Sequence, residues 1–398
     1  MKKLMILGGS SFALPVIKAA HDLGLYVITA DYLPDNTAHK YSDQYCNVST
    51  VDFDAVLRAA QKNIIDGIMS FACDSGVVTA AYVAEQLGLP SAGSYESVSI
   101  LQNKGRFRKF LSDHGFNVPT AKGYNDAAAA LNDVDLFHWP VIVKPTDSAG
   151  SKGVSRVDTP AGLKKAIDNA VAYSQVNEFI VEDFIEKKGC STDSDCFSVN
   201  GKLVFVSYSS QRFDENALNP YTPAAFSWPS TMTKEQEEYL TAELQRLISL
   251  LNLQTSIYNV EARVGMDDKV YIMEVSPRGG GNRLAEMVRF ATGEDMIKAA
   301  VIGALGGVPD IKQKDYQGCW AEIILHSISS GRFSALKISD KIKPYVQEID
   351  LWKEKGEDIQ SFQSARQTVG TLVLKFPNET ILNDCMNNVS DLYKVEVI

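Results

Sequence analysis

Several features that identify common classes of protein are missing from this sequence. The 398 residues include only six cysteines, none of them in a Cys-x-x-Cys pair. This spacing argues against a disulfide framework and favours free thiols in a reducing, cytoplasmic compartment. No apolar run is long enough to cross a bilayer, and there is no internal repeat or low-complexity segment.

An excess of positive charge is also missing. The chain has 39 Lys and Arg against 49 Asp and Glu, a formal net charge of −10. This balance argues against a surface for nucleic acid or for an anionic membrane, and it leaves room for a local basic cleft. With 45% hydrophobic residues, the chain can bury substantial cores, and its length predicts two or three domains.

The amino terminus has two lysines and a short apolar run, as a signal peptide does. Gly8-Gly9-Ser10-Ser11 ends this run too early for a signal sequence, so we predict a first strand instead. Strand and helix patterns then alternate as far as Leu87, which predicts a parallel sheet covered on both faces. The turn is not G-x-G-x-x-G, and Asp31 alone does not make a dinucleotide site, so a structural turn or a substrate-side loop is favoured.

Two lysines and a flexible loop suggest a phosphate site. Lys104 lies in a charge cluster on a predicted helix, where a solvated helix face is the ordinary explanation. Lys144 stands near the end of an apolar strand in "WPVIVKPTDSAGSKGV", and the loop that follows could wrap phosphate oxygens with its N–H groups. The loop lacks the Walker pattern, so a flexible surface hairpin is the alternative. Its candidate residues are Ser148, Gly150, Ser151 and Gly153.

The segment Phe179–Gly189, "FIVEDFIEKKG", begins as an apolar strand and becomes polar. Such a strand can present its backbone to an adenine edge, with Glu182 accepting a hydrogen bond from the exocyclic amine. A plain connector between subdomains explains the same pattern equally well.

The runs 258–264 and 270–275 alternate between apolar and polar residues and predict the two strands of a hairpin. The only polar break between them contains two aspartates at its centre. An even-numbered loop about this centre pairs Val264 with Tyr271.

The same register places Glu261 directly opposite Glu274 on one face of the hairpin. Two carboxylates with Cβ atoms roughly 5 Å apart repel by about 3 kcal/mol at an effective dielectric constant near 20. This predicts a cation between them, and oxygen ligands alone indicate Mg²⁺ or Mn²⁺. The alternative is an edge hairpin with both glutamates in water, because a slip of one residue separates the pair.

The order of these motifs resembles that of the ATP-grasp superfamily of ligases. The matching elements are the α/β start, Lys104, "VIVKP" with its Gly/Ser loop, "VEDFI", and "VEARV" followed by "YIMEVSPR". The resemblance implies an ATP-grasp fold of mixed α/β and α+β class. It implies an N-terminal parallel α/β domain over 1–95, an ATP-grasp domain over 96–300 with a lid over about 118–185, and a small C-terminal α/β cap over 301–398.

The resemblance also implies residue roles. The loop Ser148–Gly153 closes over the phosphates. The ATP-binding residues are Lys104, Lys144, Ser148, Gly150, Ser151, Gly153, Glu182 and Phe184. The residues for Mg²⁺ or Mn²⁺ are Glu261, Glu274 and Ser276, the last standing where the family usually has asparagine. Where the family commonly has an acidic ribose contact, this chain has Cys190 or Ser191, with Asp193 or Asp195 nearby.

Arg278 matches the family arginine that stabilises the migrating phosphoryl group, and an ordinary surface turn is its alternative. Gly280 and Gly281, with Asn282 as the cap of the next helix, are a candidate site for a substrate carboxylate. The Pro- and aromatic-rich segment Asn219–Ser230 reads equally well as a wall of the substrate pocket or as a structural loop.

The function implied by the resemblance is ATP-dependent ligation of a carboxylate to an amine through an acyl phosphate, with amino acids among the candidate substrates. The alternatives are a bicarbonate-activating carboxylase of the biotin-carboxylase or carbamoyl-phosphate type and a purine-pathway ligase such as phosphoribosylglycinamide synthetase. A nucleotide-binding regulator without chemistry and an NAD-dependent oxidoreductase rank lower. The expected partners are small molecules, with no nucleic acid and no membrane, and a homodimer is compatible with the sequence.

Overall fold

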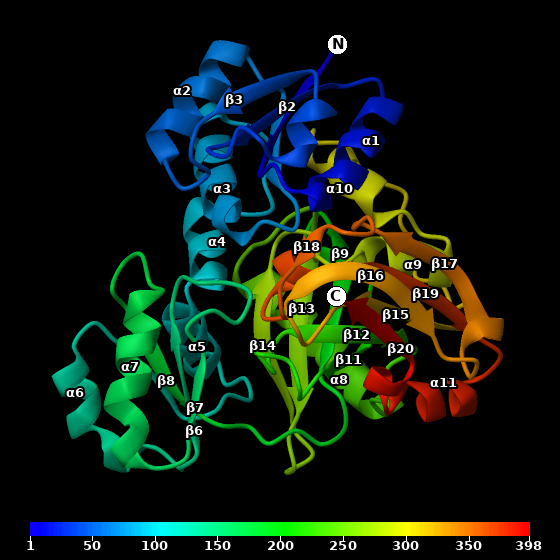
Figure 1. Cartoon of the computed structure of the whole chain (residues 1–398). Coiled ribbons are helices and arrows are strands. Elements are labelled where there is room, and N and C mark those ends of the chain that lie inside the picture. Colours follow the sequence, from blue (N-terminus) through cyan, green and yellow to red (C-terminus); the bar gives the residue numbers. More distant parts are fainter.

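A four-stranded parallel sheet opens the computed structural model, which describes residues 1–398 (Figure 1). Its strands, in the spatial order β3-β2-β1-β4, are β1 (Lys3–Leu7), β2 (Tyr26–Asp31), β3 (Gln44–Asn47) and β4 (Gly67–Ser70). The helices of this part are α1 (Leu14–Asp22), α2 (Phe53–Asn63) and α3 (Val77–Leu87). Leu4 and Ile6 face the core that includes α1, whereas Met5 and Leu7 face the core that includes α2 and α3. The prediction of a parallel sheet covered on both faces is confirmed.

The glycine-serine turn after β1 is held by residues of its own domain. The Gly9 N–H donates to Asp31 Oδ2 at 2.9 Å, and Asp31 Oδ1 accepts from the Leu33 N–H at 2.8 Å. The His39 ring packs so closely against Gly9 that a Cβ there would overlap it. Asp31 is therefore engaged in the turn, which supports the structural explanation over a dinucleotide site.

A lid follows the linking helices α4 (Tyr95–Gln102) and α5 (Lys104–Asp113). Its antiparallel sheet, in the order β5-β8-β6-β7, consists of β5 (Ala121–Tyr124), β6 (Val141–Pro145), β7 (Ser155–Val157) and β8 (Phe179–Asp183). The helices α6 (Ala127–Asn132) and α7 (Leu163–Ala172) contribute to its core. The lid extends away from the rest of the chain at the lower left of Figure 1.

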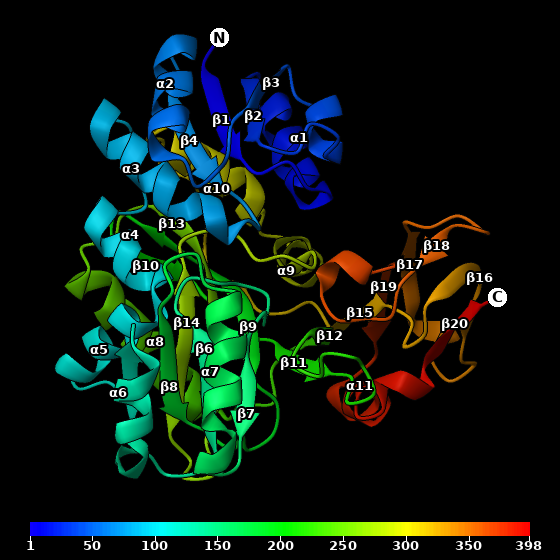
Figure 2. The same cartoon turned by 60° about the vertical axis from the view of Figure 1, so that its left-hand side comes forward.

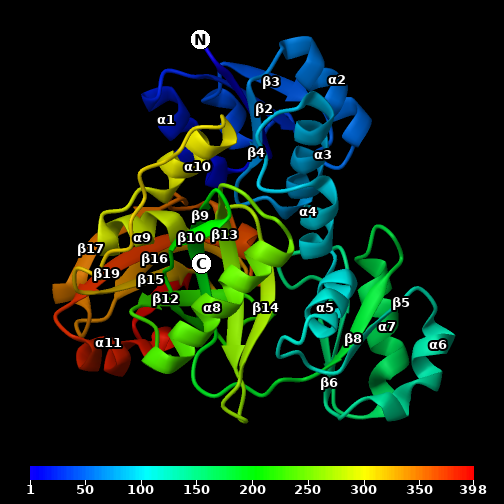
Figure 3. The ribbon, with the colours of Figure 1, turned by 180° about the vertical axis from the view of Figure 1, so that it is seen from behind.

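The central sheet carries the residues that matter most for function. It contains, in spatial order, β10 (Lys202–Phe205), β9 (Thr192–Val199), β13 (Ser256–Val264) and β14 (Val270–Ser276). The helix α8 (Lys234–Leu250) packs its leucines on one face, against alternate residues such as Val260 and Ala262 (Figure 3). The polar residues of β13 and β14 therefore lie on the opposite face.

The hairpin β13–β14 reaches the expected glutamate pair by a different register. The loop is Gly265–Lys269, closed by the Gly265 N–H donating to Lys269 O at 2.9 Å, and Val264 pairs with Val270. The predicted pairing of Val264 with Tyr271 is therefore wrong. A β-bulge then leaves Met273 without a partner, and this restores the pairing of Glu261 with Glu274, which is confirmed.

The C-terminal part contains two sheets (Figure 2). The larger one, in the order β11-β12-β15-β19-β17, consists of β11 (Ser210–Phe213), β12 (Pro223–Trp228), β15 (Cys319–Leu325), β19 (Gly370–Phe376) and β17 (Val346–Leu351). The smaller one joins β18 (Asp358–Ile359), β16 (Gly331–Ile338) and β20 (Tyr393–Val397), and α11 (Glu379–Met386) packs on the larger sheet. None of the helices in the molecule combines the length and the apolar composition that crossing a membrane requires.

Sheet membership departs from the predicted domain limits in two places. Strands β11 and β12, which fall within 96–300, complete the C-terminal sheet, so part of the segment Asn219–Ser230 is a structural strand. Helix α9 (Leu284–Thr292) packs against β15 and β9, whereas α10 (Met296–Ala304) returns to the N-terminal sheet, where Met296 and Val301 join its core (Figure 1). The limits 1–95, 96–300 and 301–398 themselves stay a prediction.

The loop after β14 touches the N-terminal domain at Gly279. The Ala72 N–H donates to Gly279 O at 3.1 Å, and a Cβ on Gly279 would overlap the buried Phe71 ring. We expect Gly279→Ala to destabilise the protein by about 1–3 kcal/mol through overpacking. Gly281→Ala is the matched control, because a Cβ there meets no atom within 4 Å. The midpoints of thermal unfolding check this prediction, and equal midpoints for the two variants would contradict the close approach.

Candidate active site

Acidic and polar side chains form two rows across the face of the central sheet that is opposite α8. Asp193, Glu261 and Glu274 are paired across strands β9, β13 and β14. Asp195, Asn259 and Ser276 form the neighbouring row. Burial and, after it, the charge of Glu274 raise the pKa of Glu261. The sheet therefore concentrates negative charge in a site partly removed from water.

Two lysines from other parts of the chain approach this face. Lys104 starts α5, and its Nζ lies 3.6 Å from Glu274 Oε2 and donates to Ser148 O at 2.8 Å. Lys144, on lid strand β6, forms an ion pair with Glu182 on β8. Burial lowers the pKa of Lys144, Glu182 opposes this shift, and the charge of Lys104 contributes to it. The structure thus brings the two predicted phosphate lysines to the same face of the central sheet.

Glu182 is engaged by two basic side chains. Its side chain is 2% exposed and is held by Lys144 and by Arg108 Nε at 3.0 Å. Burial alone would raise the pKa of Glu182, but Lys144 and Arg108 outweigh it and lower the pKa to about 2. Each oxygen of this carboxylate accepts one hydrogen bond within an ion-pair triad, and its bond to an adenine amine stays a prediction.

The backbone of the hinge is also engaged in part. The Phe184 N–H donates to Pro140 O at 3.0 Å, so it is not open to a ligand. The next N–H, that of Ile185, has no acceptor in the chain, and Ile185 is only partly buried. In the segment 184–185, after β8, the Ile185 N–H is therefore free to donate, whereas the role predicted for the Phe184 backbone in binding adenine stays a prediction.

The loop after Lys144 bridges the lid and the C-terminal part. Ser148 O accepts from Lys104, and Ser151 Oγ donates to Tyr221 O at 3.1 Å. Gly150 and Gly153 both have φ near +70°, which only glycine adopts without strain. The loop therefore lies beside both phosphate lysines and against the loop that precedes β12.

Arg278 is fixed by a residue of the N-terminal domain. Its Nε and Nη2 lie 2.8 and 2.6 Å from Asp74 Oδ1, and its Nη1 donates to Asn259 Oδ1 at 3.1 Å and to Gly279 O at 3.0 Å. Burial would raise the pKa of Asp74, but the guanidinium outweighs it and lowers the pKa. Sequence reasoning missed Asp74. The available signal was its position after β4, at the carboxyl edge of a parallel sheet.

Ser276 is 1% exposed and hydrogen-bonded on both sides. It accepts from Gln102 Nε2 at 2.9 Å and donates to Asp74 Oδ1 at 3.1 Å. These bonds favour a positioning role for Ser276 over the expected role of metal ligand. The assignment of Ser276 as a metal ligand stays a prediction.

Asp193 and Asp195 lie beside this network. The amide of Asn259 donates to both carboxylates, and the Gly280 N–H donates to Asp195 Oδ1 at 2.8 Å. Burial, reinforced by Glu261, raises the pKa of Asp193 to about 8, and burial raises that of Asp195 to about 7. Asp195 therefore anchors the glycine loop to the central sheet.

The glycine loop ends at α9 without the expected cap. The helix begins at Leu284 after Arg283, which has φ of 58° and makes no side-chain cap, so the prediction of Asn282 as the cap is wrong. Asn282 and Arg283 both adopt the left-handed conformation, and Gly281 borders open space. Gly280, Gly281 and Asn282 thus form a short loop between Arg278 and the start of α9.

The residues present fit a hard divalent cation only in part. No three His, Cys, Asp or Glu side chains converge closely enough to hold a metal by themselves. Glu261 and Glu274 offer oxygen ligands on one face, and Mg²⁺ is commonly held by one or two carboxylates together with substrate phosphates. The donor set thus fits a cation that arrives with a nucleotide.

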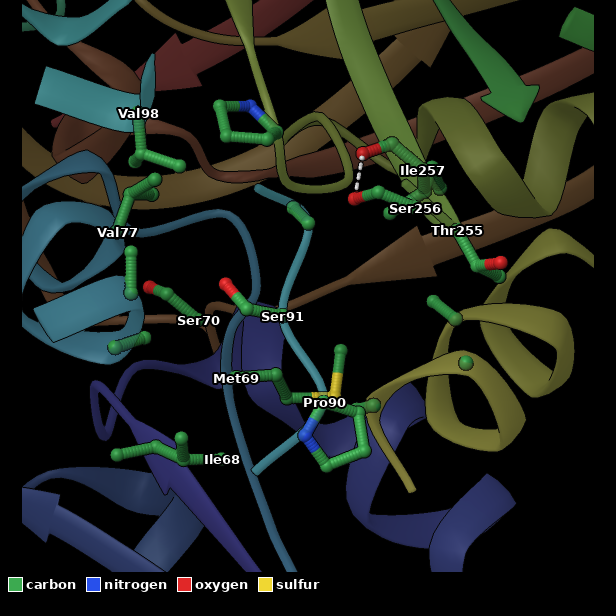
Figure 4. A pocket seen from close by; sticks show the side chains of 17 residues that line it. Ile68, Met69, Ser70, Val77, Pro90, Ser91, Val98, Thr255, Ser256 and Ile257 are labelled. Atoms are coloured by element: carbon green, nitrogen blue, oxygen red, sulfur yellow. Dashed lines mark hydrogen bonds between the residues drawn. The ribbon is translucent and has the colours of Figure 1, made fainter. Parts of the chain in front are cut away.

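A separate cavity lies between β4, α3, α10 and the start of β13 (Figure 4). Its lining includes Ile68, Met69, Val77 and Val98 and contains no charged residue. The hydroxyl of Ser256 is turned to its own neighbour, donating to Ile257 O at 2.8 Å. The cavity is a packing gap between domains and offers no group for catalysis.

Comparison with known proteins agrees with this geometry. Residues 137–286 match the ATP-grasp domain family. The carbamoyl phosphate synthase large chain of Ralstonia nicotianae is 24% identical over 339 residues, which are 81% of this chain and 30% of the relative. The chain spans only 18–30% of the length of such relatives.

Two solved structures share the fold over nearly the whole chain. The L-amino acid ligase from Bacillus licheniformis has a TM-score of 0.80 at 19% identity, covering 100% of this chain and 99% of that one. The biotin carboxylase domain of Hydrogenobacter thermophilus 2-oxoglutarate carboxylase, in complex with MgADP, ADP and bicarbonate, has a TM-score of 0.76 at 16% identity, covering 99% and 90%. Residues 137–286 therefore match an ATP-grasp domain, and the expected fold class is confirmed.

The glutamate pair gives a prediction about stability. Because the pKa of Glu261 is raised in the folded protein, ionising it costs stability as pH rises above the ordinary glutamate value. We expect Glu261→Gln to hold or raise the thermal midpoint without metal at pH 7, with the difference vanishing near pH 4. Mg²⁺-dependent stabilisation by ATP should be lost in Glu261→Gln and in Glu274→Gln. Retention of this stabilisation in either variant would refute the metal assignment.

Lys144 gives a prediction about nucleotide affinity. Loss of a charge-assisted contact to phosphate should raise the Kd for ATP by about tenfold or more in Lys144→Ala, measured by calorimetry. In Lys144→Ala the buried Glu182 carboxylate would keep only Arg108 as an ion-pair partner, which should lower the stability of the fold. Adding Glu182→Gln should recover this stability without recovering the affinity for ATP. Lys164→Ala, which removes an exposed pair with Asp168 on the lid helix α7, is the control. Unchanged affinity would place the nucleotide elsewhere, and NADH binding without ATP binding would revive the oxidoreductase alternative.

Proposed function

We propose that this protein is an ATP-dependent ligase that joins a carboxylate to an amine through an acyl phosphate. The observation that carries the proposal is the convergence of Lys104, Lys144 and Arg278 on the sheet face that holds Glu261 and Glu274. Three cations from separate parts of the chain surround a pair of like charges. This arrangement suits the binding of a metal-bound triphosphate and the transfer of its terminal group.

The nucleotide would lie between the lid and the central sheet. Lys104 and Lys144 would bind its phosphates beneath the loop 148–153, and the Ile185 N–H would meet the adenine edge. Glu261 and Glu274 would hold Mg²⁺, or Mn²⁺ in its place. The cation supplies positive charge that neutralises the phosphoryl oxygens during transfer.

The reaction balances in two displacements. An oxygen of the substrate carboxylate attacks the γ-phosphorus, the bond to the β-phosphate oxygen breaks, and ADP leaves. The amine nitrogen then attacks the acyl carbon and loses a proton, and phosphate leaves. The first step is needed because a free carboxylate is too weak an electrophile for an amine.

Arg278 is suited to the first step because its direction is fixed. Four of the five N–H groups of a guanidinium are engaged by Asp74, Asn259 and Gly279, and one Nη2 N–H remains free. A preorganised charge stabilises developing negative charge without having to reorient during the reaction. Gly280, Gly281 and Asn282 would receive the substrate carboxylate nearby.

The bicarbonate in the complex of the 2-oxoglutarate carboxylase domain supports bicarbonate as a second candidate for the acid. A screen of ADP release across amino acids and small acids, with and without bicarbonate, separates the two. A cytoplasmic location, small-molecule partners and a homodimer belong to the same proposal. The dimeric state reported for the 2-oxoglutarate carboxylase domain supports the homodimer.

Trapping of the intermediate tests the proposal. Hydroxylamine should convert the acyl phosphate to a hydroxamate only when ATP, Mg²⁺ and the correct acid are present together. Arg278→Ala should lower the hydroxamate yield by about tenfold or more with little change in the Kd for ATP, because its charge acts mainly in the transition state. Arg278→Lys should recover only part, since an ammonium cannot reach Asp74, Asn259 and Gly279 from one plane. Release of AMP and pyrophosphate would show an adenylate instead and would refute the mechanism.

A further inference from the structure

Three basic side chains without a carboxylate partner meet where the hinge segment 185–191 adjoins β11 and β13. Lys187, Arg212 and Arg263 take part in none of the ion pairs of the protein, although acidic residues outnumber basic ones by 49 to 39. In such a chain a basic side chain can usually find a carboxylate. A group of three that does not is therefore informative.

Arg212 is the most telling of the three. Its side chain on β11 is largely buried, with the residue 8% exposed. Its Nη1 donates to Ser227 Oγ at 2.7 Å and to Ser210 O at 3.1 Å, whereas Nε and Nη2 have no acceptor. Arginine is almost never buried without a partner, because removing its charge from water costs several kcal/mol. Burial accordingly lowers the pKa of Arg212.

Arg263 brings a second charge to the same junction. It lies two residues beyond Glu261 on the same face of β13, roughly 7 Å along the strand. Its Nη1 donates to Ile185 O at 3.1 Å, and its Nε is buried with no partner. The guanidinium is thus tied to the hinge on one side and unsatisfied on another.

Lys187 connects the two arginines. Its backbone pairs with that of Gly265, two residues after Arg263. Its Nζ lies 5.1 Å from the centroid of the ring of Phe213, the residue that follows Arg212 in β11. Burial lowers the pKa of Lys187, Cys190 and Glu215 oppose the shift without forming an ion pair, and the charges of Arg263 and Arg212 add to it. Ser191, close by in the same segment, has a buried Oγ without a hydrogen-bond partner. The junction therefore holds three cations and an unsatisfied hydroxyl.

We propose that Lys187, Arg212 and Arg263 form a binding subsite for a phosphate group. The free Nε–H and Nη2–H of Arg212 match two oxygens of one oxyanion, and three positive charges suit a dianion better than a monoanion. The phosphate belongs either to the bound nucleotide or to a separate phosphorylated substrate. The subsite accounts for an oddity of the sequence, in which Cys190 and Ser191 stand where a ribose-binding carboxylate was expected. A carboxylate at that place would compete with the phosphate.

Binding of inorganic phosphate to the full-length protein, measured by calorimetry at constant ionic strength, tests the subsite without turnover. We expect Arg212→Gln and Arg263→Gln each to raise the Kd for phosphate by about tenfold or more, and Arg212→Lys to raise it less. The control is Arg332→Gln, at a side chain 68% exposed and remote from the hinge, which should leave the Kd within about twofold. The thermal midpoint of Arg212→Gln should not fall, because a buried unpaired charge is removed.

A repeat with a saturating non-hydrolysable ATP analogue and Mg²⁺ distinguishes the sources. Phosphate that still binds in the presence of the analogue indicates a separate phosphorylated substrate. Phosphate that is displaced, together with weaker analogue binding by Arg212→Gln, indicates a phosphate of the nucleotide. The proposal is overturned if the wild type does not bind phosphate, or if its affinity depends on Lys144 and not on Arg212 or Arg263. Failure of the ligase chemistry would leave these binding results unchanged.

Discussion

The crowding of carboxylates on one face of the central sheet is the constraint on which the rest of this molecule depends. Strand pairing fixes Asp193, Glu261 and Glu274 side by side, and the backbone cannot separate them without losing the ladder. Burial and their mutual repulsion raise the pKa of Asp193 and Glu261, and positive charge from elsewhere offsets the repulsion when they ionise. Lys104 comes from the linking helix, Lys144 from the lid and Arg278 from the loop after β14. The site is therefore complete only when these parts of the chain are docked together.

The sequence was a good guide where periodicity and charge act locally. The alternation of residues in β13 and β14 revealed both strands and the face on which Glu261 and Glu274 lie. The local register was wrong, because the sequence does not show that the loop has an odd number of residues. It also does not show that Met273 is left out of the pairing. The bulge matters because without it Glu261 would lie opposite Met273, and the two carboxylates would point to opposite faces.

Interactions between distant segments were harder to predict from the sequence. Glu182 and Phe184 were assigned to adenine from their place in a motif. The motif does not show that the Glu182 carboxylate accepts a hydrogen bond from Arg108, or that the Phe184 N–H donates to Pro140 O. Asp74 escaped notice because a single aspartate in a loop has no periodicity. Its meaning comes from Arg278, some two hundred positions away in the chain. Side chains of this kind are determined by how domains dock, and no local pattern records that docking.

The return of α10 to the first sheet has a consequence for how the molecule can move. The N-terminal unit is closed by residues 296–304, which follow the glycine loop and α9 within a few residues. Asp74 and the contact of Phe71 with Gly279 tie the same unit to the same loop from the other side. The first domain therefore cannot swing independently of the loop that would hold the acid. Opening for substrate entry is left to the lid, whose only covalent connections to the body are the two ends of its chain segment.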